Sequence, residues 1–255
     1  MDILDQDEMS RIEPDDEYTL FIFRLPLFNP ENDVTYLTIP LGIVLFSDKI
    51  ITICWTDCEV LKDVSSNRIK NISIENFLTF ILKIMSRTDS NFLRYLKEIN
   101  RRTITIQGEL QMSVKNNELI QLFNLEKSLE YFTTSLKSNQ LLIEKLSKMK
   151  GIYLDEDQKD FLEDIAIDNR QAIEMTDIYS NILSGMMDAF ASVISNNLNI
   201  VMKRLTVVSL VLNVPTLIVS FFGMNIQLPF ANSGWIGTIC VSSICLVATF
   251  LASLI

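Results

Sequence analysis

The spacing of hydrophobic positions divides the chain into a part with the period of strands and a longer part with the period of helices. Between Tyr18 and Trp55, three short runs rich in β-branched and aromatic residues are separated by Asn, Asp and Pro, which is typical of β-strands. From Ser73 onward, apolar residues recur three and four positions apart, with Ser73 as a candidate N-cap and Asn116-Asn117 as a candidate break. The pattern predicts a small α/β unit followed by helices.

The longest predicted helix follows Gly151. Three acidic residues, Asp155 to Asp157, suit a helix N-terminus, where negative charge interacts favourably with the helix dipole. No proline or other strong break occurs before Pro215. The sequence therefore predicts one helix from about Asp155 to Phe222, on the order of 100 Å long at the usual rise per residue.

Two apolar segments near the C-terminus are candidate membrane spans. The first, Leu205–Phe222, is 18 residues long and the second, Trp235–Ile255, is 21; an 18-residue helix rises about 27 Å, close to the hydrocarbon thickness. The segment between them contains two Gly and one Pro, which favour a turn. Because Lys203 and Arg204 precede the first span and the loop has no basic residue, we expect the long N-terminal part in the cytoplasm and the loop outside.

Charge and composition narrow the functional classes. The chain has 22 Lys and Arg against 32 Asp and Glu, a net charge of -10, and every charged residue lies at or before Arg204. A nucleic-acid partner is not expected for so acidic a chain. There is no His, which excludes a Ser/His/Asp triad, a Cys/His pair and a His-ligated zinc site. The sequence also has no Gly-rich phosphate loop, so we do not expect an enzyme.

A polar stripe runs along the predicted long helix. Steps of alternately four and three residues meet Asn181, Gly185, Asp188, Ser192, Ser195, Asn199, Met202, Thr206, Ser209, Asn213, Thr216 and Ser220. Such a seven-residue repeat keeps one face directed at a supercoil axis. Inside a membrane, a polar face is stable against water or other polar surface. The stripe therefore predicts a pore at the centre of a ring of subunits; the alternative is that its small polar residues pack against the second span.

The turn after the first span carries a family resemblance. Gly223-Met224-Asn225 at this place in a two-span hairpin, preceded by NIVMKRLT at Asn199–Thr206 and SGMMDAF at Ser184–Phe190, resembles the CorA family of divalent-cation channels. The resemblance covers most of the chain. It implies a funnel-shaped homopentamer in the plasma membrane that lets Mg2+ pass passively, with cytoplasmic divalent ions as regulators.

The resemblance and the patterns together give the expected fold, an α+β cytoplasmic domain with a long stalk helix and two C-terminal transmembrane helices. We expect residues 1–72 to be the strand part of an N-terminal α/β domain that lacks its first strands, 73–152 its helical part, 153–222 the stalk and pore helix, 223–234 the external loop, and 235–255 the second transmembrane helix. We also expect the chain to stop at Ile255 without the basic tail of the family.

The selectivity filter implied by the resemblance is Gly223, Met224 and Asn225. Mg2+ dehydrates reluctantly, so a ring of Asn225 amides can accept hydrogen bonds from its water shell without the strong binding of carboxylates. We expect Gly223 to end the helix in a left-handed or otherwise non-helical conformation. Met224 is expected to pack, because a thioether is a poor ligand for a hard ion.

Further positions follow from the resemblance. Along the pore, Thr216 resembles a second polar constriction, and Asp188 an acidic ring at the cytoplasmic end. The family's narrow neck corresponds by this resemblance to Asn199, Met202 and Leu205. Asp164 with Asp2 of a neighbouring subunit resembles the regulatory metal pair.

Two departures from the family and two rival functions accompany this interpretation. Asn213 stands where the family usually has an apolar constriction, and the external loop IQLPFANSG has no acidic residue to gather cations. A related transporter of Zn2+, Co2+ or Ni2+ would share every feature named. A non-conducting scaffold anchored in the bilayer would need the anchor and the coiled coil, but neither the polar stripe nor the Gly-Met-Asn motif.

Overall fold

A computed structural model of the chain describes residues 5, 8–66, 68–69, 76–112, 116–149, 154–224 and 234–253. The chain divides into two compact units, Met1–Met187 and Asp188–Ile255. The first unit contains a sheet, three helices and the beginning of a fourth. The second contains the rest of the fourth helix and a fifth. The expected α+β domain and long helix are both present.

The sheet has four antiparallel strands in the order in which they follow one another along the chain. They are β1 (Arg11–Pro14), β2 (Thr19–Phe28), β3 (Tyr36–Leu45) and β4 (Ile50–Ile53). Continuous buried runs lie at residues 21–26 and 38–43 of the two long central strands. Such runs arise when both faces of a strand are covered, and they explain why β2 and β3 are apolar at most positions.

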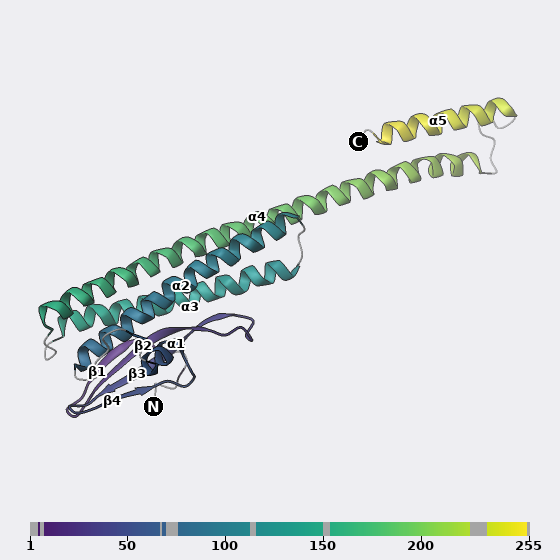
Figure 1. Cartoon of the computed structure of the whole chain (residues 1–255). Coiled ribbons are helices and arrows are strands. Elements are labelled where there is room, and N and C mark those ends of the chain that lie inside the picture. The colour runs from purple at the N-terminus through teal and green to yellow at the C-terminus, as the bar shows by residue number, and fades with distance from the viewer. Residues whose placement is uncertain are drawn as a thin grey trace. The chain divides into compact units, whose positions relative to one another are not determined.

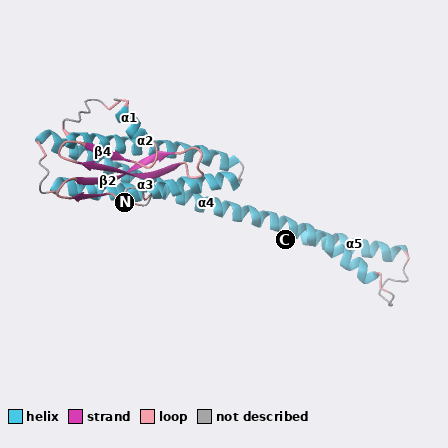
Figure 2. Cartoon of the chain, turned by 90° about the horizontal axis from the view of Figure 1, so that it is seen from below, coloured by secondary structure: helices cyan, strands magenta, loops and turns pink. Residues whose placement is uncertain are grey.

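The helices are α1 (Glu59–Ser65), α2 (Phe77–Met112), α3 (Asn116–Lys148), α4 (Glu156–Phe222) and α5 (Trp235–Ser253). In the first unit, α2 and α3 lie between the sheet and the beginning of α4 (Figure 1). Figure 2, seen from the side of the sheet, shows the strands lying over α2 and α3. In both views α5 runs back alongside the C-terminal part of α4.

The N-terminus of α4 is fixed by a capping box. The Gln158 N–H donates to Asp155 Oδ1 at 2.7 Å, and the Asp155 N–H donates to Gln158 Oε1 at 3.1 Å. Gln158 Nε2 also donates to Asn76 Oδ1 and Thr79 Oγ1, at 3.2 and 3.0 Å. Asn76 itself accepts from the Thr79 N–H at 3.1 Å, as an N-cap of α2 does. The expected cap, Ser73, lies outside the described residues.

The hydrophobic core of the first unit joins the sheet to all three long helices. Leu25 and Ile43 of the sheet cluster with Ile81 of α2, Leu142 of α3 and Leu162 of α4, and each is less than 5% exposed. Burial of this apolar surface supplies the main favourable free energy of folding. The beginning of α4 is therefore an integral part of the core of the first unit.

A polar link fastens α3 to the sheet beyond the end of β1. The pairing of β1 with β2 stops at Arg11 and Ile22, and Asn139 of α3 then takes the place of a strand at Arg24. Its Nδ2 donates to Arg24 O at 2.9 Å, and its Oδ1 accepts from Arg24 N at 2.9 Å and from Ser10 Oγ at 2.6 Å. Asn139 is 4% exposed, so it satisfies backbone groups that water does not reach.

Replacing Asn139 with alanine should therefore lower the free energy of unfolding by about 1–3 kcal/mol, because buried polar groups of Arg24 would lose their partners. Denaturant unfolding of the purified chain measures this. Gln140→Ala is the matched control, since the Gln140 side chain donates to Glu144 on the exposed surface of the same helix, and the change in its free energy of unfolding should stay within about 0.5 kcal/mol. Equal losses in the two variants would contradict a special role for Asn139.

Candidate functional site

One face of α4 in the first apolar segment is partly covered, and that face is apolar. Between residues 207 and 218 the half-buried side chains are Val207, Leu210, Val211, Val214, Pro215 and Ile218. Val211 and the α5 residues Leu246, Val247 and Phe250 line an apolar hollow. Helix α5 thus packs against the hydrophobic side of α4.

The polar stripe lies on a different face of the same helix. Its members in the apolar segment, Thr206, Ser209, Asn213, Thr216 and Ser220, are all exposed. At 3.6 residues per turn, their mean direction is roughly 150° from that of the half-buried residues. Within one chain, the stripe therefore does not pack against the described part of α5. This argues against the alternative in which the small polar residues of the stripe join the two apolar helices.

Two threonines of the stripe are bonded to their own helix. Thr206 Oγ1 donates to Met202 O at 2.8 Å, and Thr216 Oγ1 donates to Leu212 O at 2.7 Å. Pro215 lies inside α4 and has no N–H to donate. The hydroxyl of Thr216 therefore supplies an additional hydrogen bond to a backbone carbonyl in the turn where Pro215 removes one.

The other expected pore positions lie farther back on α4. Asp188, Ser192, Ser195, Asn199, Met202 and Leu205 are all exposed in the single chain. All residues from 191 to 206 are exposed, so exposure singles out no face in that part of α4; the stripe positions from Asp188 to Ser220 are exposed throughout. Asn225, the residue expected to select the ion, lies outside the described residues.

The left-handed alternative expected for Gly223 is wrong, whereas α4 does end at Phe222, immediately before this glycine. The Gly223 N–H donates to Val219 O at 2.9 Å, which continues the helical pattern beyond Phe222. Among the described glycines, the one with a positive φ is Gly234, at 53°, immediately before α5. A Cβ at Gly223 would lie 3.3 Å from Val219 O, so close approach to the preceding turn, rather than backbone handedness, favours glycine here.

The structure does not test the expected pair of regulatory carboxylates. Asp164 is exposed on α4, and Asp2 lies outside the described residues. Among residues that the structure describes, no group of three or more His, Cys, Asp or Glu side chains could hold a metal ion. A site between neighbouring subunits remains a prediction.

The two C-terminal helices differ in whether their length and apolar composition suit a membrane span. Within the described ranges, α4 is the one helix that is long and apolar enough to cross a membrane, and its apolar window has no buried residue. In α5, the apolar stretch Trp235–Leu251 is shorter. The first expected span is thus supported by length and composition, and the second is a shorter apolar helix.

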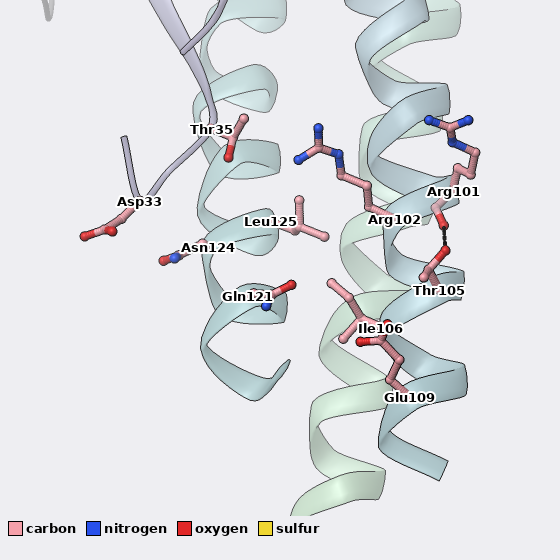
Figure 3. Close-up of a pocket in the computed structure, with 10 residues that line it drawn as sticks. All are labelled: Asp33, Thr35, Arg101, Arg102, Thr105, Ile106, Glu109, Gln121, Asn124 and Leu125. Atoms are coloured by element: carbon pink, nitrogen blue, oxygen red, sulfur yellow. Dashed lines mark hydrogen bonds between the residues drawn. The ribbon is translucent and has the colours of Figure 1, made fainter. Parts of the chain in front are cut away.

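A cavity of about 590 Å³ opens between α2, α3 and the loop after β2. Figure 3 shows Arg102 reaching toward Thr35, whereas Arg101 lies on the side of α2 away from α3. The Arg102 guanidinium stacks 5.3 Å from the Tyr36 ring centroid, and it pairs with Glu98 at 3.0 Å. Two carboxylates in the lining, Asp33 and Glu109, balance the two arginines. The charge of this cavity therefore does not favour ions of one sign.

Comparison with known proteins assigns the family. The whole chain, residues 1–255, matches the family described as CorA-like Mg2+ transporter protein. The "Cobalt/magnesium transport protein CorA" of Methanocaldococcus jannaschii is 30% identical over 236 residues, which cover 90% of this chain and 73% of that protein. The "Magnesium transport protein CorA" of Helicobacter pylori strain 26695 is 23% identical over 203 residues, 78% of this chain and 63% of its own length.

Solved structures show the same fold. The complete CorA magnesium transporter structure from M. jannaschii matches with a TM-score of 0.83 at 24% identity, covering 98% of this chain and 78% of that one. The full-length CmaX structure matches with a TM-score of 0.74 at 13% identity, covering 97% and 78%. The match over the whole sequence, the curated relative and the shared fold agree, and the chain belongs to the CorA-like Mg2+ transporter family.

Proposed function

We propose that the chain forms a homopentameric channel in which α4 lines the pore and hydrated Mg2+ passes down its electrochemical gradient. The observation that carries the proposal is the uncovered polar stripe of α4, which lies away from the apolar face that packs on α5. A polar face on a membrane helix is stable only against water or other polar groups. A ring of five such helices would satisfy it with a water-filled pore.

The stripe supplies the ion path from the cytoplasm outward. Asp188 carboxylates would concentrate cations at the inner end by Coulomb attraction. Asn199, Met202 and Leu205 would form the neck, and Thr216 a polar constriction. Asn225 would hold the water shell of the ion at the outer mouth, which suits an ion that dehydrates reluctantly. Asn213, between neck and mouth, would make the gate wetter than an apolar ring.

The proposed topology has two spans. α4 crosses the plasma membrane through Leu205–Phe222, residues 223–234 form the external loop, and α5 crosses back. Lys203 and Arg204 immediately before the first span support a cytoplasmic N-terminal domain. The described part of α5 has 19 residues, which rise about 28 Å as a helix, close to the hydrocarbon thickness.

Flux into liposomes that contain the purified chain tests this function. Mg2+ should enter fastest, with Co2+ also carried, because the M. jannaschii relative is named for both ions. Faster entry of Zn2+ or Ni2+ would instead assign the chain to the related transporters. Absence of flux for all four ions, with the protein inserted and pentameric, would favour a non-conducting scaffold.

We also propose that cytoplasmic Mg2+ closes the channel by bridging Asp164 to a carboxylate of the next subunit, with Asp2 as the candidate. Carboxylates repel one another across a subunit interface, and a hard dication between them would offset the repulsion. An ion that binds the closed state stabilises it by about 2.7 kcal/mol at roughly one hundred times its dissociation constant. The bridge would give negative feedback on uptake.

Asp164→Asn should therefore weaken the protection that Mg2+ gives the cytoplasmic domain against protease, because one bridging carboxylate is lost. The measurement is the rate of cleavage with and without Mg2+. Glu163→Gln is the control, since Glu163 is also exposed but points about 100° away on the helix. Undiminished protection in the Asp164 variant would assign regulation to other carboxylates.

A further inference from the structure

Asp89 of α2 meets Asn169 of α4 inside the first unit. Asp89 is 2% exposed and Asn169 is fully buried. Asn169 Nδ2 donates to Asp89 Oδ1 at 3.2 Å. The second oxygen of each side chain, Asp89 Oδ2 and Asn169 Oδ1, is buried without a hydrogen-bond partner. Buried polar atoms nearly always have partners, so these two oxygens require an explanation.

An ionised Asp89 does not fit this environment. A carboxylate only accepts hydrogen bonds, and so does an amide oxygen, which leaves Oδ2 of Asp89 and Oδ1 of Asn169 without a hydrogen to share. A buried charge with one neutral donor is also strongly disfavoured. Burial raises the pKa of the Asp89 carboxyl to about 8; the Asn169 hydrogen bond opposes the rise, and the Asp168 carboxylate adds to it.

Among the residues that the structure describes, no charged group of a neighbouring element pairs with Asp89. Helix α1 presents Glu59 and Asp63, which both contact Arg87 of α2. The charged residue of β2, Arg24, donates to polar groups of α3 and β3. The buried side chains of α3 are all uncharged. On α4, the charged group that acts on Asp89 is Asp168, which has the same sign.

We propose that Asp89 and Asn169 form a proton-binding site, in which Asp89 keeps its proton and donates it from Oδ2 to Asn169 Oδ1. With the observed bond from Asn169 Nδ2 to Asp89 Oδ1, this closes a ring of two hydrogen bonds between α2 and α4. One proton taken from solvent satisfies both unpartnered oxygens and removes the buried charge. Release of that proton opens the ring and leaves two acceptors without a donor.

The sign of the pH dependence follows from the two states of the chain. An unfolded Asp releases its proton near pH 4, whereas the folded site holds it to about pH 8. Between these values the folded state binds more protons, so the stability contributed by the site falls as pH rises and levels off above the folded pKa. Asn169 lies on α4, which continues into the first apolar span. Opening of the ring would therefore release a contact of the helix that lines the proposed pore, a consequence that rests on the proposed function.

The substitution Asp89→Asn tests the site, because an amide can form the same two-bond ring without titrating. Thermal unfolding of the full chain in detergent, from about pH 5 to about pH 9, should give nearly equal midpoints for wild type and variant at the acid end. At the alkaline end, the variant should unfold several degrees higher. Glu163→Gln, which removes an exposed carboxylate of α4, the helix that carries Asn169, should show no such divergence.

Infrared spectroscopy provides a second measurement. The carbonyl band of a protonated carboxyl should be present in wild type at neutral pH, fade in alkali, and be absent from the Asp89 variant. A variant less stable than wild type at every pH, a gap that does not change with pH, or a missing band in wild type would overturn the proposal and leave Asp89 ionised, with an internal water as its partner. Neither measurement involves ion flux, so failure of the proton site and failure of the transport function are distinguishable.

Discussion

An Asn225→Ala variant is expected to carry no divalent-cation flux above background in liposomes, although it folds and assembles like the wild type. The proposed ring of amides replaces part of the environment that bulk water gives the hydrated ion. Alanine has neither the carbonyl oxygen nor the NH2 group, so the water shell would have no partner at the mouth. The loss concerns ion recognition and not the packing of α4 or α5.

The matched control is Gln227→Ala, which removes another amide from the same loop and should leave flux near the wild-type rate. Native mass spectrometry from mild detergent checks that both variants remain pentamers. Wild-type transport by the Asn225 variant would remove this residue from the selectivity filter. Monomers that still conduct would contradict the oligomeric pore itself.

Placing one apolar side chain on the polar stripe should have an effect of similar size. In Ser209→Leu, the proposed pentamer gains a ring of leucines facing the pore axis, and hydrophobic constrictions exclude water and block conduction. Flux should fall to background while the helix remains intact, because leucine is a good helix former and a lipid-compatible residue.

Val208→Leu is the control for this variant. It introduces the same side chain one residue away, at an exposed position about 100° around the helix, where lipid or a neighbouring subunit is expected. The control should conduct normally. Equal loss of flux in both variants would indicate a general packing defect and would contradict the assignment of the stripe to the pore.

Much of the fold follows from periodicity because long elements repeat their signal many times. The continuous α4 was predictable from the acidic residues at its start, the lack of breaks and the three-and-four spacing of apolar positions. Strands β2 and β3 were predictable from their β-branched and aromatic runs. The direction of the stripe relative to α5 could not be predicted, because the sequence does not show which face of one helix meets another.

Single polar contacts between distant segments were also beyond the sequence. Asn139 pairs with Arg24 across 115 positions, and Asn169 with Asp89 across 80. In the sequence, Asn139, Asn169 and Asp89 resemble solvated positions on helices, and Arg24 resembles a solvated position on a strand. For Gly223 only the left-handed alternative was wrong, and it was expected because a glycine at a helix end usually adopts that region. Here the helical hydrogen bond continues to Gly223, and the constraint is steric.

The threonine bonds within α4 bear on the sign of the ion. Thr206 and Thr216 donate their hydroxyl hydrogens to carbonyls of their own helix, so each oxygen presents only lone pairs to its surroundings. Water around a cation points its hydrogens outward, whereas water around an anion points its oxygens outward. In the proposed pore, these hydroxyl oxygens accept hydrogen bonds from the water around a cation and repel the water around an anion. The segment after Arg204 has no formal charge, and it could still reject chloride through the orientation of two hydroxyl dipoles per subunit.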